Sequence, residues 1–501
     1  MEEINIIQTE EDRGITKRGT LNLVFSVCCL VIAYLFVGSI NSIIPGRCVP
    51  LGYLILSVSL YALTAVIACI NGGRIRIDSV IAFCFGSIVA SYRFIHGDVS
   101  NDLFPVFLMS LLSYGYFTLS LYGNSSRSVT GRLLLDCVKV VASLFISFSS
   151  LFVSIFKPEG RKKSPKNTLL VIVGLIIAII LVVIVASLLS YDSHFTELLP
   201  KLDADMVFDV LAKVFFTIPI AAMMFSIFAS SERHKLNGLS SVNSVEKISA
   251  GMKKIPPALV AIPVFSVLVI YVLFFVSQWA YYMSAFTHTL PDGYSAAEYA
   301  REGFFRLCVV VSINSALIIV IGCFMKIVGK AGETLQKIMK LLLSVASLIL
   351  IATAVSKMLL YIDLYDLTVD RLAVTVFLVF LAISFIAVII SCLFRRVRSL
   401  PIIIVSALVM IAAFTLINTN GLIAKYNVDM YISGKHQNID VEYLAKELSY
   451  SAVPELGRLY ENAQDETVKL RAKKCLEENF ADKDFEWYEL SMPIINSKMG
   501  G

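Results

Sequence analysis

The chain alternates between long apolar runs and short polar segments as far as residue 418. An apolar run of about 20 residues crosses the hydrocarbon core of a bilayer as a helix, because a helix satisfies its own backbone polar groups. We therefore expect an all-α, polytopic transmembrane helix bundle. The pattern predicts eleven spans, at residues 21–43, 50–70, 78–95, 102–122, 168–190, 207–230, 257–280, 304–325, 341–361, 372–394 and 401–418.

Beyond residue 418 the long runs give way to three short amphipathic segments. Asp440 suits the N-cap of the first helix, and Pro454 suits the first turn of the second. The apolar residues that share a helical face are Val441, Leu444, Ala445 and Leu448, then Val453, Leu456, Leu459, Tyr460 and Ala463, then Val468, Ala472, Cys475 and Leu476. We expect residues 419–501 to form a small helical-hairpin domain of solenoid type, which leans on the membrane surface or on the spans.

A further helical segment, 131–156, is long enough to span but carries a polar stripe. Its polar residues recur at steps of three and four, at Asp136, Lys139, Ser143, Ser147, Ser150 and Ser154. This spacing places them on one face of a helix. The stripe fits a helix in the membrane interface, a helix packed with its stripe against the bundle, or a full span.

The distribution of Lys and Arg among the loops predicts the orientation of the chain in the membrane. The basic segments, which together hold seventeen Lys and Arg, are 157–166, 232–254, 326–340 and 395–398. The segments between them, which together hold three, are 191–206, 283–302 and 361–371. Short loops rich in Lys and Arg remain in the cytoplasm. The split therefore predicts a cytoplasmic N-terminal segment, 1–20, and an extracytoplasmic C-terminal domain.

The first four spans, 21–122, follow the same rule, with Arg74 and Arg76 inside and the turn at 96–102 outside. A full span over 131–156 breaks the alternation. We therefore interpret 131–166 as an amphipathic interfacial helix followed by a basic cytoplasmic loop, and 168–418 as seven further spans.

Composition supports a membrane protein. The chain is 57% hydrophobic and 16% charged, with a mean hydropathy of +0.78 and a net charge of +5, whereas soluble domains are about 25% charged. The positive excess lies in residues 1–418, which hold 33 basic and 24 acidic residues against 10 and 14 in residues 419–501. This excess suits the lipid bilayer and its anionic headgroups as partners, and it is no argument for nucleic acid.

Common catalytic motifs are absent from the sequence. It contains no P-loop, GxGxxG, HExxH, GxSxG or kinase motif, which argues against the common ATP-, NAD- and serine-hydrolase chemistries. We expect no cofactor and no metal. Among the cysteines only Cys48 and Cys475 are predicted outside, where a disulfide competes with the simpler interpretation of free thiols.

One candidate site is a charged collar at the outer mouth of the eighth span. Glu298, Arg301, Glu302 and Arg306 lie three or four positions apart, so ion pairs within the helix are available. The collar either orients the helix at the interface or forms the entrance of a polar pocket. The candidate residues are Tyr299, Arg301, Glu302, Arg306 and Asn314.

A second candidate site combines acidic and imidazole side chains of predicted external loops. Its residues are Asp192, His194, His288 and Asp292, with His96, Asp98 and Asp102 in a third loop. Converging loops of this kind can hold a metal or a proton. The same residue types are also ordinary in loops, and no spacing here is typical of a metal site.

Five segments resemble a known family in their order along the chain. They are VASLLSYDSHF at 185–195, VLFFVSQWAYYMSAF at 272–286, AEYAREGFFRL at 297–307, YIDLYDLTVDRL at 361–372 and DVEYLAKELSYSAVPEL at 440–456. Together they resemble the uncharacterised bacterial polytopic membrane family known only as a domain of unknown function, the forty-one-seventy-three group with its forty-one-fifty-three relatives. The resemblance covers roughly residues 168–460. It implies a bacterial plasma-membrane protein without an established activity.

Two turns depart from what this resemblance implies. Ser190, Tyr191 and Asp192 stand where relatives carry Ser-Ala-Asp, and Asp366 stands where a glycine is expected before Leu367.

The sequence favours an integral inner-membrane protein of unknown molecular activity, acting as a transport, sensory or envelope-assembly component. A first alternative is a secondary transporter of a small solute or ion, which needs a broken helix or inverted halves near the midplane. A second alternative is a membrane-embedded glycosyl-type transferase. Such transferases resemble one another in carrying acidic residues on a large first external loop. In this chain the predicted first external loop, near 45–50, holds no acidic residue, so we rank an enzyme last.

Overall fold

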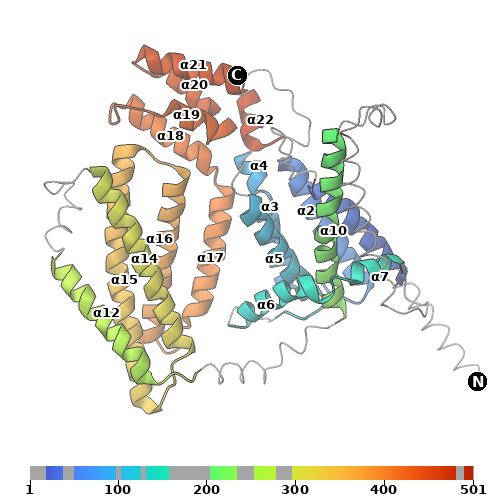
Figure 1. The fold of residues 1–501 in the computed structure, drawn as a ribbon, viewed down its shortest axis with the longest axis horizontal. Coiled ribbons are helices and arrows are strands. Elements are labelled where there is room, and N and C mark those ends of the chain that lie inside the picture. Colours follow the sequence, from blue (N-terminus) through green and yellow to red (C-terminus); the bar gives the residue numbers. More distant parts are fainter. Residues whose placement is uncertain are drawn as a thin grey trace, which may run out of the picture. The chain divides into compact units, whose positions relative to one another are not determined.

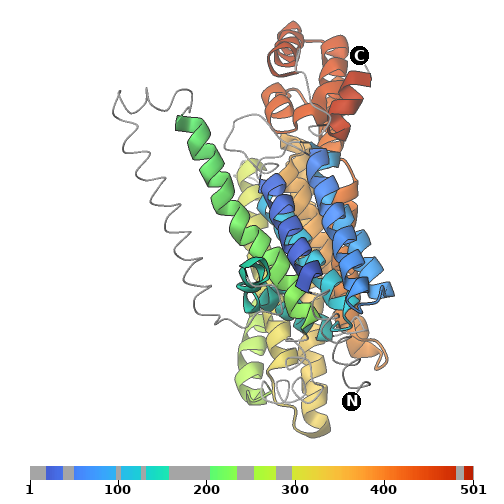
Figure 2. The same cartoon turned by 90° about the vertical axis from the view of Figure 1, so that its right-hand side faces the viewer.

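A computed structural model describes residues 19–37, 50–97, 103–125, 131–156, 204–233, 253–277, 296–480 and 490–499. The described part of the chain is helical apart from turns and one isolated bridge between Ile255 and Met325. The chain forms two compact units (Figures 1 and 2). Unit 1 holds residues 1–128, 132–239 and 484–495, and unit 2 holds most of the remainder, chiefly 240–483.

Unit 1 is built from the helix Gly19–Val37 and the first labelled helices of Figure 1. These helices are α2 (Pro50–Ile70), α3 (Ile77–Ala90), α4 (Tyr92–His96), α5 (Leu103–Leu121), α6 (Gly131–Ile146), α7 (Ser150–Phe156) and α10 (Ala204–Glu232). Unit 2 holds α12 (Pro257–Ser277), α14 (Ala296–Cys323), α15 (Gly329–Tyr365), α16 (Val369–Leu393) and α17 (Ser399–Leu416). It continues with α18 (Thr419–Ile432), α19 (Val441–Lys446), η2 (Ser449–Ala452), α20 (Val453–Asn462) and α21 (Glu466–Phe480). The last helix is α22 (Met492–Met499).

Nine helices of the described residues are long and apolar enough to cross a membrane. They coincide with nine of the predicted spans, while the fourth is a shorter apolar helix over Val106–Leu121. The predicted span 168–190 lies outside the described residues. A multi-pass, all-helical membrane protein is thus confirmed, and the total of eleven spans stays a prediction.

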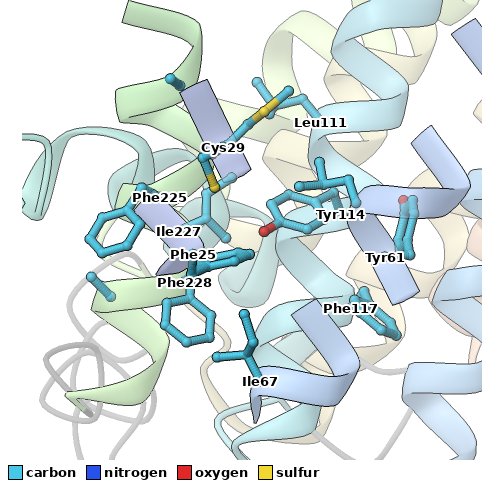
Figure 3. Packing of buried hydrophobic residues seen from close by; sticks show 14 of the residues in the cluster. Phe25, Cys29, Tyr61, Ile67, Leu111, Tyr114, Phe117, Phe225, Ile227 and Phe228 are labelled. Carbon is cyan, nitrogen blue, oxygen red and sulfur yellow. The ribbon is translucent and has the colours of Figure 1, made fainter. Parts of the chain in front are cut away.

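Aromatic side chains fill the core of unit 1 (Figure 3). The Phe25 ring lies 4.5 Å from the Phe228 ring and 5.9 Å from that of Phe225, which joins the first helix to α10. Glycines allow the helices to approach closely. A Cβ atom built on Gly115 of α5 would lie 2.2 Å from Val140 of α6, so a larger residue there would push the two helices apart.

The polar stripe of residues 131–156 faces the interior of unit 1. Asp136 and Ser143 are fully buried, and Lys139 is 3% exposed. The opposite face of α6 is apolar and exposed at Val138 and Phe145. Among the arrangements considered from the sequence, the structure has the stripe packed against the bundle. A position of α6 in the membrane interface stays a prediction.

Buried polar contacts hold α6 in this orientation. Lys139 Nζ donates to Asp136 Oδ1 at 2.8 Å and to the backbone carbonyl of Asn124 at 3.0 Å. Helix α10 satisfies the end of α6, because Ser226 Oγ donates to the carbonyl of Ser143 at 2.6 Å. Charge pairing and hydrogen bonds therefore satisfy the part of the stripe on α6, as buried polar groups require, whereas Ser154 Oγ on α7 is buried without a hydrogen-bond partner among the described residues.

Contacts within each unit show which helix ends lie together. In unit 1, Glu232 accepts from the Asn71 amide at 3.0 Å, and the Asn124 amide donates to the carbonyl of Ser231 at 2.9 Å. In unit 2, the backbone of Ile255 pairs with the segment around Met325. All of these residues flank segments predicted to lie inside.

The opposite ends are grouped in the same way. A Cβ atom built on Gly97, at the end of α4, would lie 3.6 Å from Ser491 Oγ, which directly precedes α22. Both residues belong to segments that the charge pattern places outside. In unit 2 the turn between α15 and α16 contacts α18 through Asn427 and α19 through Tyr443.

Candidate functional site

The turn between α15 and α16 has an unusual backbone. Asp366 has a φ of 67° and a ψ of 165°, a region in which residues other than glycine are strained. Thr368 caps α16 by accepting a hydrogen bond from the Arg371 backbone at 3.4 Å. The Arg371 guanidinium donates to the carbonyl of Tyr365 at 2.5 Å and to that of Asp366, and it lies 4.2 Å from the centre of the Tyr361 ring. Arg371 therefore satisfies carbonyls at the end of α15.

Side chains of the C-terminal helices bind this turn. The Asn427 side chain accepts from the Leu367 N–H at 2.8 Å, and its amide donates to the Leu367 carbonyl at 2.9 Å. The hydroxyl of Tyr443 accepts from the Val369 N–H at 3.0 Å. His436 Nδ1 lies 2.5 Å from Asp366 Oδ1. We call these four contacts the latch.

Apolar packing surrounds the latch. Leu367, Val369 and Leu372 pack against the buried cluster of the C-terminal helices. That cluster consists of Ile423, Ala424, Val428, Val441, Leu444, Ala445, Leu448, Ala452, Leu456, Leu459, Ala463 and Ala472. It contains eight of the thirteen inward positions that the sequence predicted, and Val468, Cys475 and Leu476 pack against it in part. Tyr460 was wrongly placed on this face, because it is exposed. Figures 1 and 2 show these helices at the end of α15 and α16.

Local signals fold the C-terminal helices as expected. Asp440 caps α19 by accepting from the Tyr443 N–H at 2.9 Å, and Pro454 lies at the start of α20. Arg458 then links α20 to α18, because it donates to Asp429 at 2.7 Å. This hydrogen bond to Asp429 raises the pKa of Arg458, which stays charged in any case.

Burial raises the pKa of Tyr443, whose hydroxyl accepts the hydrogen bond from the Val369 N–H in the latch. The folded protein thus keeps this phenol protonated to a higher pH than the unfolded chain does. The linked stabilisation is present below the ordinary tyrosine pKa of about 10 and is lost as the pH rises through the raised value. The latch is accordingly expected to weaken only in strongly alkaline solution through this group.

Two substitutions at Asp366 separate backbone strain from the contact with His436. Both Asp366→Gly and Asp366→Ala remove the carboxylate, but only glycine adopts the positive φ without a penalty. We expect Asp366→Gly to have a higher free energy of unfolding than Asp366→Ala, by about 1 kcal/mol. Urea unfolding of the purified protein measures the difference. Equal stabilities would mean that the turn is not strained at this residue.

Asn314, a candidate from the charged collar, lies in a different buried cluster. It is fully buried, accepts from the Tyr271 hydroxyl at 2.6 Å, and donates to Ser347 Oγ at 2.9 Å. It therefore joins α14 to α12 and α15 inside unit 2. Arg306, two turns earlier on α14, is exposed. The structure does not bring these two candidates together.

The other candidates remain predictions. Tyr299, Arg301 and Glu302 lie in the first turns of α14, and their side chains are outside the described residues. Most external-loop candidates also lie outside them, namely Asp98, Asp102, Asp192, His194, His288 and Asp292, whereas His96 ends α4 and is fully buried. So does Cys48, the proposed partner of Cys475, whose thiol is free. Among the described residues no group of three or more His, Cys, Asp or Glu could hold a metal ion.

Sequence reasoning did not single out Asn427, His436 or Tyr443 as site residues. Asn427 and Tyr443 lie on the helices that the turn contacts, and the contacts span 60 to 74 positions of sequence. The only signal was indirect. The segments 361–372 and 440–456 both carry the family resemblance, and the structure places them against each other.

Comparison with known proteins identifies a family and no activity. No curated protein and no solved structure matches the chain. A family model described as "Domain of unknown function (DUF4153)" matches residues 80–459, which is about three quarters of the chain and includes the turn, Asn427, His436 and Tyr443. The family resemblance seen in the sequence is thereby confirmed. The chain belongs to the DUF4153 family.

Proposed function

We propose that this protein is a sensory or envelope-assembly component of the bacterial plasma membrane. In this proposal the helices α18 to α21 form an extracytoplasmic receiving domain. The latch couples the conformation of that domain to α15 and α16. These two helices then transmit a conformational change across the membrane. The observation that carries the proposal is the double hydrogen bond of Asn427 to both backbone groups of Leu367.

This double bond supports coupling for a physical reason. Backbone N–H and C=O groups that are shielded from water need partners, and one side chain of the receiving domain supplies both partners of the half-buried Leu367. If the domain moves away, the turn loses them together with the contact between Asp366 and His436. The ends of α15 and α16 then have to rearrange. A domain attached only by a linker would leave them unchanged.

The charge pattern supports the proposed orientation, and the contacts between helix ends are compatible with it. Loops rich in Lys and Arg alternate with acidic ones along the chain. Contacts inside each unit then group the flanking residues in the same two sets, as with Asn71 and Glu232 on one side and Gly97 and Ser491 on the other. These observations agree with a cytoplasmic N-terminus and an extracytoplasmic C-terminus.

Hydrogen exchange in lipid nanodiscs tests the coupling. Asn427→Ala should raise amide exchange in the last two turns of α15 and the first two of α16, beyond the receiving domain itself. Asn462→Ala is the matched control, because Asn462 is exposed and its hydrogen bond within the described part of the chain goes to the Arg458 carbonyl of its own helix. If Asn427→Ala raised amide exchange in residues 419–480 alone, the result would contradict the proposed role of the latch.

A secondary transporter is the second candidate, and it is favoured by the break between α6 and α7. Residues 147–149 interrupt the helix inside unit 1, where Ser147 N–H donates to Ser226 Oγ at 3.1 Å. Transporters often place interrupted spans at their binding sites, so this alternative requires the segment 131–156 to cross the membrane rather than lie in the interface. Uptake of radiolabelled small ions into proteoliposomes, compared with empty liposomes, tests this alternative.

A further inference from the structure

One end of unit 2 is strongly basic. Residues 253–260, 321–340 and 391–399 hold nine Lys and Arg and one acidic residue, Glu333. Backbone hydrogen bonds hold two of these segments together, because the Ile255 N–H donates to the Phe324 carbonyl at 3.1 Å and the Lys326 N–H donates to the Ile255 carbonyl at 2.9 Å. Arg395 reaches Glu333 at 4.0 Å. The basic charge is thus concentrated at one place in the fold.

Lys340 is the lysine that enters this end most deeply. Its side chain is half-buried and lies over Gly322 of α14, where a Cβ atom would be 3.4 Å from the ammonium nitrogen. Lys253, and the thiols of Cys323 and Cys392, are its electrostatic neighbours. Among the described residues the ammonium has neither a carboxylate nor a hydrogen-bond acceptor. A half-buried ammonium within the electrostatic range of a second lysine is stabilised by a bound anion.

We propose that this end of unit 2 binds the phosphate of an anionic phospholipid, with Lys340 and Lys253 as its donors. Basic pockets between membrane helices bind such headgroups. The glycine at position 322 leaves the space in which the ammonium lies. Exposed apolar side chains continue from the basic end, at Leu259 and Ile262 of α12 and at Ile338 and Leu342 of α15. They provide a surface for acyl chains, which a soluble phosphate would not use.

The proposal rests on the membrane placement of the protein, but it does not depend on the latch. Lipid binding is measured at the basic end, and coupling is measured by exchange at α15 and α16 next to the receiving domain. Either proposal can therefore fail without the other.

Lipid titration of the delipidated, full-length protein in detergent tests the site by native mass spectrometry. Phosphatidylglycerol should bind more tightly than phosphatidylcholine, and added salt should weaken its binding. Lys340→Gln should weaken phosphatidylglycerol binding about tenfold, which corresponds to ~1.4 kcal/mol. Lys340→Arg should retain it. Lys253→Gln should weaken it about threefold, and because Lys253 is exposed, the change is expected to leave folding intact.

Lys446→Gln is the charge-matched control, because Lys446 is exposed on α19 and pairs with Glu442. The proposal is overturned if Lys446→Gln weakens binding as much as Lys340→Gln does, or if neither Lys340→Gln nor Lys253→Gln has an effect. Inorganic phosphate and glycerol 3-phosphate, added at the same concentration, should not displace the lipid. Displacement by either would identify a soluble phosphate as the ligand and would overturn the assignment to a lipid.

Discussion

Replacing Lys139 by methionine should lower the free energy of unfolding by about 3–5 kcal/mol. The Asp136 carboxylate is fully buried and receives the Lys139 ammonium at 2.8 Å. Methionine fills a similar volume but leaves the carboxylate without this cation, and it also removes the donor to the Asn124 carbonyl. Chemical unfolding in detergent measures the loss. Limited proteolysis should also cleave the segment 131–156 faster in the variant than in the unchanged protein.

A matched pair provides the control for this prediction. Glu466 and Lys469 have the same spacing on a helix and a similar distance of 2.9 Å, but Glu466 is exposed. Lys469→Met should therefore cost only about 0.3–0.5 kcal/mol. The double variant Asp136→Leu with Lys139→Met should recover much of the stability that Lys139→Met loses. Additive losses in the double variant would contradict the loss of the buried ion pair as the cause.

Replacing Asn427 by alanine should have the second largest effect, a loss of about 2–4 kcal/mol from two unpaired backbone groups. Asn427 is 2% exposed, so water cannot readily take its place at Leu367. Limited proteolysis should then release the C-terminal helices before the membrane helices unfold. Asn462→Ala should change the stability by less than about 0.5 kcal/mol. If both variants lost stability equally, the latch would contribute no more than an exposed asparagine does.

The architecture could largely be predicted because membrane helices follow one local rule. Apolar length alone located the spans, as with Pro257–Ser277 and Val369–Leu393. Boundaries were less accurate where polar helix formers extend a span. Helix α15 begins at Gly329 rather than near residue 341, because Lys, Glu and Gln support a helix beyond the apolar segment.

The candidate site could be predicted only in part, because its contacts are remote in sequence. The departure at Asp366 was visible as a missing glycine, and the structure gives the reason, since that residue has a positive φ. Its pairing with His436 spans 70 positions, and no local pattern reports such a distance. Similarly, the stripe from Asp136 to Ser150 was visible, but periodicity cannot say which side of a helix faces the protein.

Fusions that report topology test the central claim, that the C-terminal domain and the basic loops lie on opposite sides of the membrane. Alkaline phosphatase is active only outside the cytoplasm, so a fusion after Gly501 should be active and a fusion after Lys254 inactive. Fusions at Lys17 and Lys163 should both be inactive if the segment 131–156 does not span. The reverse pattern, with an active fusion after Lys254 and an inactive one after Gly501, would contradict the account.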